Sequence, residues 1–167
     1  MKVIKSPMSF EVKLITLLTS IILISIPITL FFSSKSFLIQ LLATIGVVFV
    51  FFLLLSKSVK NITTKNNQLI LNYRIGKKNI DFQDIVSINK LDFNNLTMTF
   101  GSQGVFGFNG NLIDNSRASV NNRKNMIEIK TKKTNYIVSI DNVDKSILYL
   151  KQKIITTANR VGDPASQ

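Results

Sequence analysis

The sequence contains no cysteine and no histidine. Without cysteine the chain forms neither a disulfide nor a thiolate metal site, and the redox compartment is left undetermined. Without histidine it lacks the commonest general base, the commonest metal ligand and the usual pH switch. Catalytic triads of the familiar kinds and zinc sites are thereby excluded. We therefore expect a protein that is not an enzyme and that holds no metal or other cofactor.

Acidic side chains are also scarce: nine Asp and Glu stand against 21 Lys and Arg, which gives a formal net charge of +12. Such an excess favours polyanionic neighbours, either nucleic acid or the anionic face of a membrane. A second interpretation stays open, because the chain is rich in Asn, Ile and Lys together, as expected when the coding DNA is biased. The sequence has no RNP-type aromatic motif and no recognition-helix pattern, so nucleic acid is not an expected partner.

Charge is missing altogether from two apolar runs, residues 14–32 and 37–55, each 19 residues long. A helix that rises about 1.5 Å per residue over this length nearly spans the ~30 Å hydrocarbon core of a bilayer. Neither run has the polar stripe of a buried helix in a soluble protein. No small-residue cleavage site of a signal peptide follows the first run. The runs therefore predict two transmembrane helices, the first kinked but not ended by Pro27.

The two predicted helices must be antiparallel, because only residues 33–36 separate them. Lysines flank them unevenly: Lys2, Lys5 and Lys13 precede the first helix, Lys35 lies in the turn, and Lys57, Lys60 and Lys65 follow the second. The positive-inside rule then predicts a two-helix protein of the cytoplasmic membrane with both termini in the cytoplasm. We expect a cytoplasmic tail over 1–13, the transmembrane hairpin over 14–56 and a juxtamembrane linker over 57–67.

From Gln68 onward, apolar and polar residues alternate with the period of β-strands. Leu69, Leu71 and Tyr73 mark a first strand, and Ile75-Gly76-Lys77 supplies a turn. Further strands are predicted around these residues: Ile80 and Phe82; Val86 and Ile88; Leu96, Met98 and Phe100; Ile127 and Ile129; Tyr136, Val138 and Ile140. The spacing predicts a meander of antiparallel strands.

The last predicted element is a helix. Asp141 is a suitable N-cap, and Asp144 places a second carboxylate in the first turn. One apolar stripe follows at helical spacing: Val143, Ile147, Leu150 and Ile154. We expect this helix to close one end of the sheet in a domain over 68–156, and the polar, aperiodic tail 157–167 to be disordered.

Three segments resemble the bacterial PH-like (pleckstrin-homology-like) domain family: Phe100-Gly-Ser-Gln-Gly-Val-Phe-Gly-Phe-Asn-Gly110, Asn122-Arg-Lys-Asn125 and Ile137-Val-Ser-Ile-Asp141. The resemblance covers roughly 68–154; Gln103 and Asn109 depart from the usual small and aromatic residues. It implies an α+β fold: an antiparallel β barrel or sandwich of six or seven strands, capped by the C-terminal helix and often attached to membrane helices. It implies no particular ligand, since one fold hosts many functions.

Four glycines recur at every third residue: Gly101, Gly104, Gly107 and Gly110. One interpretation is a cradle of backbone amides for a phosphate or lipid head group. The other, which we favour, is a strand pair with bulges and close backbone packing. A P-loop is excluded, because neither the Gly-Lys-Ser/Thr ending nor a following helix is present.

Eight basic residues are candidates for contact with lipid or another anion: Lys57, Lys60, Lys65, Arg123, Lys124, Lys130, Lys132 and Lys133. Lys77 and Lys78 form a further basic pair at a predicted turn. Near an anionic leaflet each such cation contributes about 1 kcal/mol. A solvated surface combined with the positive-inside signal explains the same residues.

Three hypotheses of function follow. The first is a non-enzymatic, membrane-tethered module that binds a partner protein or itself at the cytoplasmic face, through a sheet edge or the glycine-rich hairpin. The second is a reader of anionic lipid head groups that uses Arg123, Lys124 and the turn 130–133. The third is an accessory subunit whose two helices pack against a larger membrane complex.

Overall fold

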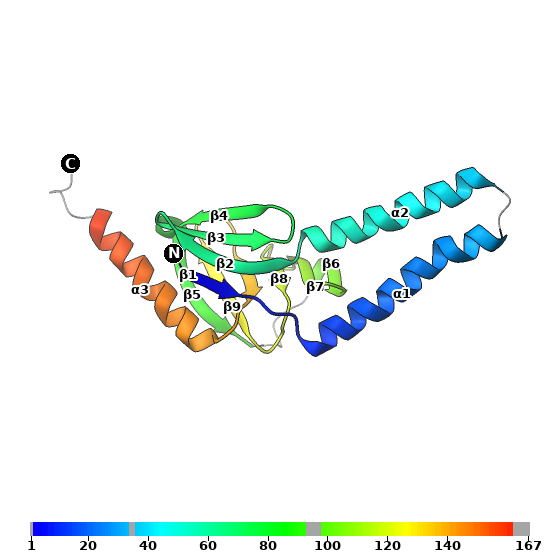
Figure 1. Ribbon diagram of the computed structural model, residues 1–167. Coiled ribbons are helices and arrows are strands. Elements are labelled where there is room, and N and C mark those ends of the chain that lie inside the picture. The colour runs from blue at the N-terminus through cyan, green and yellow to red at the C-terminus, as the bar shows by residue number, and fades with distance from the viewer. Residues whose placement is uncertain (1, 34–35, 93–97, 162–167) are drawn as a thin grey trace.

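The computed structural model describes residues 2–33, 36–92 and 98–161 (Figure 1). Its helices are α1 (Phe10–Ser33), α2 (Phe37–Ser56), the short 3-10 helix η1 (Phe82–Asp84) and α3 (Val143–Val161). Its strands are β1 (Lys2–Lys5), β2 (Val59–Lys65), β3 (Gln68–Tyr73), β4 (Lys77–Asp81), β5 (Ile85–Leu91), β6 (Met98–Gly104), β7 (Gly107–Leu112), β8 (Arg117–Val120), β9 (Met126–Thr131) and β10 (Tyr136–Ser139). The fold is α+β, as expected.

Helices α1 and α2 lie side by side and project from the β domain (Figure 1). They have 24 and 20 residues and are long and apolar enough to cross a membrane. Several hydroxyl side chains of α1 form hydrogen bonds within the helix: those of Thr16, Ser20 and Thr29 donate to carbonyls four residues earlier. Such back-bonding lets a hydroxyl lie in an apolar environment without an unpaired donor.

The first helix begins earlier than expected, at Phe10 rather than Leu14. Ser9 caps it: the Ser9 hydroxyl accepts the N–H of Val12 at 3.3 Å, which satisfies one of the free amides of the first turn. The helix continues through Pro27, as predicted. Lys35 in the connecting turn lies outside the described residues.

The four-stranded sheet has the order β1-β2-β3-β4, with every neighbouring pair antiparallel. Two expected segments are thereby corrected. Residues 1–13 are not simply a tail, since β1 pairs with β2 and Ile4 is buried opposite Ile62. Residues 57–67 are not a linker, because only Lys57 and Ser58 separate α2 from β2. Burial of Ile4, Val59 and Ile62 in one hydrophobic core holds both segments in the sheet.

The six-stranded sheet has the order β5-β9-β10-β8-β7-β6. β8 and β10 are parallel, so the strands do not form the simple meander that we expected. The two sheets are not closed into a barrel. The predicted strand pair of the glycine-rich segment is confirmed as the hairpin β6–β7, which contains a register shift between Met98 and Phe100. Leu96, expected in the same strand as Phe100, lies outside the described residues.

Helix α3 packs against β5, η1 and β9, at the end of the domain opposite α1 and α2 (Figure 1). Asn142 caps it rather than Asp141, because the Asn142 carbonyl accepts the first helical N–H, that of Ser146. The helix also continues past the expected boundary at residue 156. Thr157 is buried and extends the inward stripe of Leu150 and Ile154, which explains the extension. Residues 162–167 of the expected tail lie outside the described residues.

Candidate functional site

A cleft of about 500 Å³ opens where the two sheets meet the end of α2. We call it the basic cleft. Three parts of the fold line it: the last residues of α2, the turn between β3 and β4, and the ends of β7, β8 and β10. Its lining residues are Ser56, Lys57, Tyr73, Ile75, Gly76, Lys77, Lys78, Gly110, Asn111, Arg117, Ala118 and Tyr136.

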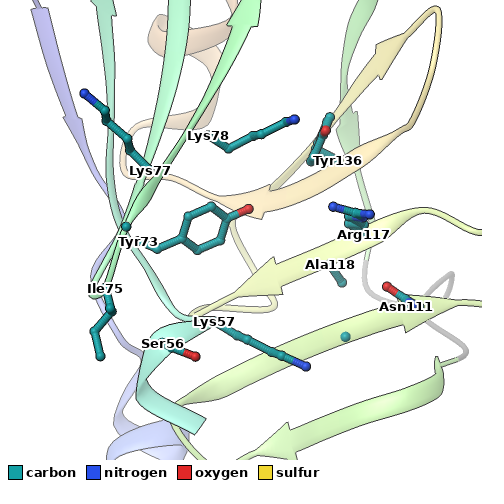
Figure 2. A pocket seen from close by; sticks show the side chains of 12 residues that line it. Ser56, Lys57, Tyr73, Ile75, Lys77, Lys78, Asn111, Arg117, Ala118 and Tyr136 are labelled. Atoms are coloured by element: carbon teal, nitrogen blue, oxygen red, sulfur yellow. The ribbon is translucent and has the colours of Figure 1, made fainter. Parts of the chain in front are cut away.

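Three exposed cations, Lys57, Lys78 and Arg117, line this cleft. Figure 2 shows Lys57, Lys78 and Arg117 on different sides of the Tyr73 ring, with Lys77 pointing away from them. All three cations are exposed, so their heads stay hydrated until a ligand enters.

Strand pairing sets the position of Arg117. It lies directly opposite Tyr136 in the parallel pair of β8 and β10, and its N–H donates to the Asn135 carbonyl at 2.8 Å. Tyr136 is 6 % exposed, so its ring forms a wall rather than a mobile side chain. The backbone of Arg117 is therefore held beside the cleft by strand pairing with a buried neighbour.

The cleft carries unbalanced positive charge, because none of its lining residues is an acid. The two ion pairs in the described part of the chain join Lys90 to Asp144 and Lys130 to Glu128, so neither involves a cation of the cleft. Burial raises the pKa of Tyr73, and Tyr136 raises it further, whereas the Arg117 guanidinium lowers it. Tyr73 is thus a neutral hydroxyl at physiological pH, able to donate a hydrogen bond to an anion.

A buried network of polar side chains fixes the cleft relative to both helices. It consists of Ser6, Ser58, Ser119, Asn121 and Ser139, all 5 % exposed or less. We call it the junction network. At its centre, the Asn121 amide nitrogen donates to the Ser6 carbonyl at 2.9 Å and to the Val59 carbonyl, and the amide oxygen accepts the Ser58 hydroxyl at 3.0 Å.

The junction network also reaches the first residue after α2. The Ser119 hydroxyl oxygen accepts the Val59 N–H at 3.0 Å and lies 2.8 Å from the Lys57 carbonyl oxygen. Ser119 follows Arg117 by two residues on β8, so one strand holds both the end of α2 and a cation of the cleft. The backbone of Lys57 is therefore held in place by the junction network.

The glycine-rich hairpin contacts the helices with its turn. The Phe106 N–H donates to the Thr16 hydroxyl of α1 at 2.8 Å, and the Phe106 ring meets the Phe51 ring of α2 edge-on at 6.1 Å. A Cβ on Gly104 would lie 3.1 Å from the Ile15 side chain. The four glycines thus serve close packing rather than a cradle around an empty space.

Glycine is required along the hairpin as well as at its turn. Gly101 lies opposite Gly110, and a Cβ on either residue would overlap the backbone of the other strand. Gly101, Gly104 and Gly107 also have positive φ angles of 152°, 105° and 106°, which L side chains rarely adopt. This backbone geometry supports the interpretation that we favoured from the sequence.

The eight cations expected to contact anions lie in separate places. Lys57 lines the basic cleft, whereas Lys60 is exposed on β2 and Lys65 lies at its far end, next to a Thr64 that bonds Tyr149 of α3. Lys130 pairs with Glu128 at 3.6 Å, and the exposed Lys132 and Lys133 lie in the turn between β9 and β10. The structure therefore joins one of these lysines to the cleft and leaves the others outside its lining.

Arg123 and Lys124 lie in the turn between β8 and β9. The Arg123 guanidinium stacks on the Phe108 ring with its carbon 4.1 Å from the ring centre. Burial lowers the pKa of Arg123, against the opposing effect of the Glu11 carboxylate. Arg123 therefore has a packing partner of its own and does not line the cleft.

Arg117 is the cleft residue that the sequence did not indicate. Its strand, β8, has the sequence Arg-Ala-Ser-Val. This segment is too short and alternates too weakly to be predicted as a strand. The parallel pairing that brings Arg117 beside Tyr136 joins residues 19 positions apart in the chain. No local pattern encodes such a contact.

Comparison with known proteins gives this chain no relative. The sequence matches no protein-family model, and neither a curated protein nor a solved structure matches it.

Proposed function

We propose that this protein is a membrane-anchored binding module whose basic cleft binds an anionic, phosphate-type group at the bilayer surface. The observation that carries the proposal is that Lys57, Lys78 and Arg117 line one cleft that has no acidic lining residue. Fixed cations in a cleft raise the local concentration of anions. An arginine adds a planar fork of donors that matches phosphate oxygens.

Membrane placement is supported by the exposure of the two helices. Large apolar side chains cover their outer faces; Leu17, Ile22 and Phe49 are each more than half exposed. Contact of these apolar faces with lipid costs little free energy, whereas their exposure to water is unfavourable. Because β1 and β2 belong to one sheet, both flanks of the helical hairpin lie on one side of the bilayer. The lysines on these flanks favour the cytoplasmic side of the cytoplasmic membrane.

Binding rather than catalysis suits the chemistry of the cleft. Its lining offers ammonium, guanidinium and phenol groups but no imidazole, thiol or carboxylate. The family proposed for the β domain is the PH-like one. Two packed sheets with a C-terminal helix at one end support that proposal.

The cleft can be tested with its own tyrosines, because the chain has three Tyr and no Trp. In a Tyr149→Phe background, the two remaining tyrosines, Tyr73 and Tyr136, both line the cleft. We expect the full chain in dodecyl maltoside micelles to give a saturable change of tyrosine emission when inorganic pyrophosphate is added. Arg117→Ala and Lys78→Ala should each weaken this binding about tenfold or more, since a hydrogen bond to a charged group is worth about 1.5–3 kcal/mol.

A matched variant controls for total charge. Lys151→Ala removes one positive charge from an exposed site on α3, at the far end of the domain. Its affinity for pyrophosphate should stay within about twofold of the parent, because charges beyond a Debye length of about 10 Å are screened. Equal weakening in Lys151→Ala and Arg117→Ala, or no saturable signal at all, would overturn the proposed function.

A partner protein at the edge of β6 is the second candidate. β6 is an edge strand of the six-stranded sheet and carries no charged residue, whereas sheet edges are commonly protected by charge. The turn of its hairpin is already in contact with α1 and α2, so the edge rather than the turn is the available surface. Light scattering of the full chain in micelles tests self-association; a strict monomer at high concentration would count against it.

An accessory role in a larger membrane complex would use the outer faces of the two helices.

A further inference from the structure

We infer that the ligand of the basic cleft is an anionic phospholipid of the same bilayer, with its phosphate in the cleft and the upper part of its acyl chains on a neighbouring apolar surface. This inference rests on the proposed function and specifies its ligand. A soluble phosphate compound shares the head-group chemistry, so the two sources must be separated by experiment.

The apolar surface is a second hollow of about 260 Å³, which we call the apolar niche. Its walls come from the last turn of α2 and from the hairpin β6–β7. Its lining residues are Leu53, Leu54, Lys57, Phe100, Gly101, Ser102 and Asn109. Phe100 is 73 % exposed and Leu53 is 44 % exposed, so this part of the domain presents an aromatic ring and an aliphatic side chain beside a helix that we place in lipid.

Lys57 belongs to both hollows. It lines the basic cleft and the apolar niche, and its ammonium lies 5.7 Å from the centre of the Phe100 ring. One molecule that fills both hollows must therefore have an anionic part on one side of Lys57 and an apolar part on the other. A phospholipid has these two parts, whereas a soluble phosphate compound has only the first.

Depth along α2 supports the same ligand. Leu53 precedes Lys57 by four residues, which at about 1.5 Å per residue places it about 6 Å deeper along the helix axis. The head-group layer on each side of a bilayer is roughly 5–8 Å thick, from the difference between the total and the hydrocarbon thickness. Lys57 at phosphate level thus puts Leu53 at the start of the acyl region.

The inference is tested by native mass spectrometry of the full chain from micelles that contain equal amounts of phosphatidylglycerol and phosphatidylcholine. We expect one phosphatidylglycerol per chain to be retained in preference to phosphatidylcholine. Phe100→Ser should reduce this retention about threefold or more and weaken pyrophosphate binding much less than Arg117→Ala does, because Phe100 lines only the niche and meets the cleft only through Lys57. Arg117→Ala should reduce both.

The matched control is Val86→Ser, which replaces another exposed apolar side chain, on β5 at the other edge of the sheet. Val86→Ser should leave both phosphatidylglycerol retention and pyrophosphate binding unchanged. The soluble head group glycerophosphoglycerol, which lacks acyl chains, should compete poorly with phosphatidylglycerol.

Two sets of results distinguish a failure of the lipid inference from a failure of the proposed function. If glycerophosphoglycerol binds as well as phosphatidylglycerol, or if Phe100→Ser leaves lipid retention unchanged, the lipid inference is wrong while an anion-binding cleft stands. If neither pyrophosphate nor phosphatidylglycerol binds in an Arg117-dependent way, the proposed function fails with it.

Discussion

At the scale of a single residue, the pKa of Tyr73 depends on the charges and the burial around the basic cleft. Burial and Tyr136 disfavour its phenolate, whereas Arg117 favours it, and the net result is a raised pKa. Because the folded pKa exceeds the ordinary value of 10.0, Tyr73 contributes stability below about pH 10. That contribution is lost as the pH rises through the folded pKa.

Arg117→Ala should therefore raise the pKa of Tyr73 further, because it removes the one group that favours the phenolate. Alkaline titration of tyrosinate absorbance, in the Tyr149→Phe background, measures this shift. Tyr73→Phe in the same background assigns the signal by removing it. An unchanged or lowered pKa in Arg117→Ala would mean that the guanidinium does not face the phenol.

Asn121 is the residue on which the junction network depends most. Asn121→Ala leaves the Ser6 carbonyl, the Val59 carbonyl and the Ser58 hydroxyl without this partner in a buried site. Each buried polar group left unpaired costs about 1–3 kcal/mol, so the loss of stability should be about 3 kcal/mol or more.

Chemical denaturation in micelles, followed by circular dichroism, measures this loss. Asn89→Ala is the matched control, since Asn89 is exposed and its amide bonds Ser87 on the same strand. A cost below about 1 kcal/mol for Asn121→Ala would show that water or neighbouring groups replace its bonds.

At the scale of elements, the hairpin β6–β7 depends on its facing glycines. Gly110→Ala places a Cβ against the Phe100 carbonyl and should separate the two strands at this point. We expect a loss of about 2–3 kcal/mol, typical of overpacking, together with a weakened contact between Phe106 and the helices. The same denaturation assay measures the loss of stability.

Gly46→Ala is the control for that substitution. A Cβ on Gly46 meets no atom within 4 Å, and alanine is a better helix former than glycine. Its stability should stay within about 1 kcal/mol of the parent. Equal effects of the two substitutions would contradict the account of the hairpin.

The elements that the sequence predicted well are those with a strong local signal. α1 and α2 follow from two uncharged runs, the hairpin β6–β7 from its glycines, and α3 from its apolar stripe. β1 was missed because Lys-Val-Ile-Lys is four residues long and reads as a charged flank of a membrane helix. Its partner β2 lies beyond both helices, so the pairing is invisible to any local pattern.

The candidate site was predictable only in part, for the same reason. Lys57 was a candidate because it follows a predicted membrane helix. Lys78 was noted only as one of a basic pair at a predicted turn, and it lies on β4. Arg117 and Tyr136 reach the cleft through a parallel pairing between strands that are not consecutive. The cleft itself exists only where two sheets and a helix meet, and three separate chain segments must be assembled before it appears.

At the scale of the whole molecule, the proposed topology predicts where the C-terminus lies. A green fluorescent protein fused after Gln167 should fluoresce in bacterial cells, because that protein folds in the cytoplasm but not after export in unfolded form. Alkaline phosphatase at the same position should be inactive, since it requires the exterior. The opposite pair of results would invert the topology and move the basic cleft to the external face.

The junction network and the contact of Phe106 with Thr16 and Phe51 join the helices and the β domain into one body. The domain is therefore not a module on a flexible tether, and under the proposed membrane placement the end of α2 sets the height of the basic cleft above the bilayer. Because the chain has no cysteine, single cysteines introduced for labelling report this height without background.

The most direct measurement is the accessibility of single nitroxide labels in the full chain, reconstituted into phosphatidylcholine and phosphatidylglycerol bilayers. Labels replace Phe100, Lys78 and Lys65 in turn, and their relaxation by lipid-soluble oxygen and by a water-soluble nickel complex is compared. We predict the strongest contact with oxygen at 100, an intermediate value at 78 and relaxation mainly by nickel at 65. A label at 78 that is as accessible to nickel as the label at 65 would contradict the placement of the cleft at the bilayer surface.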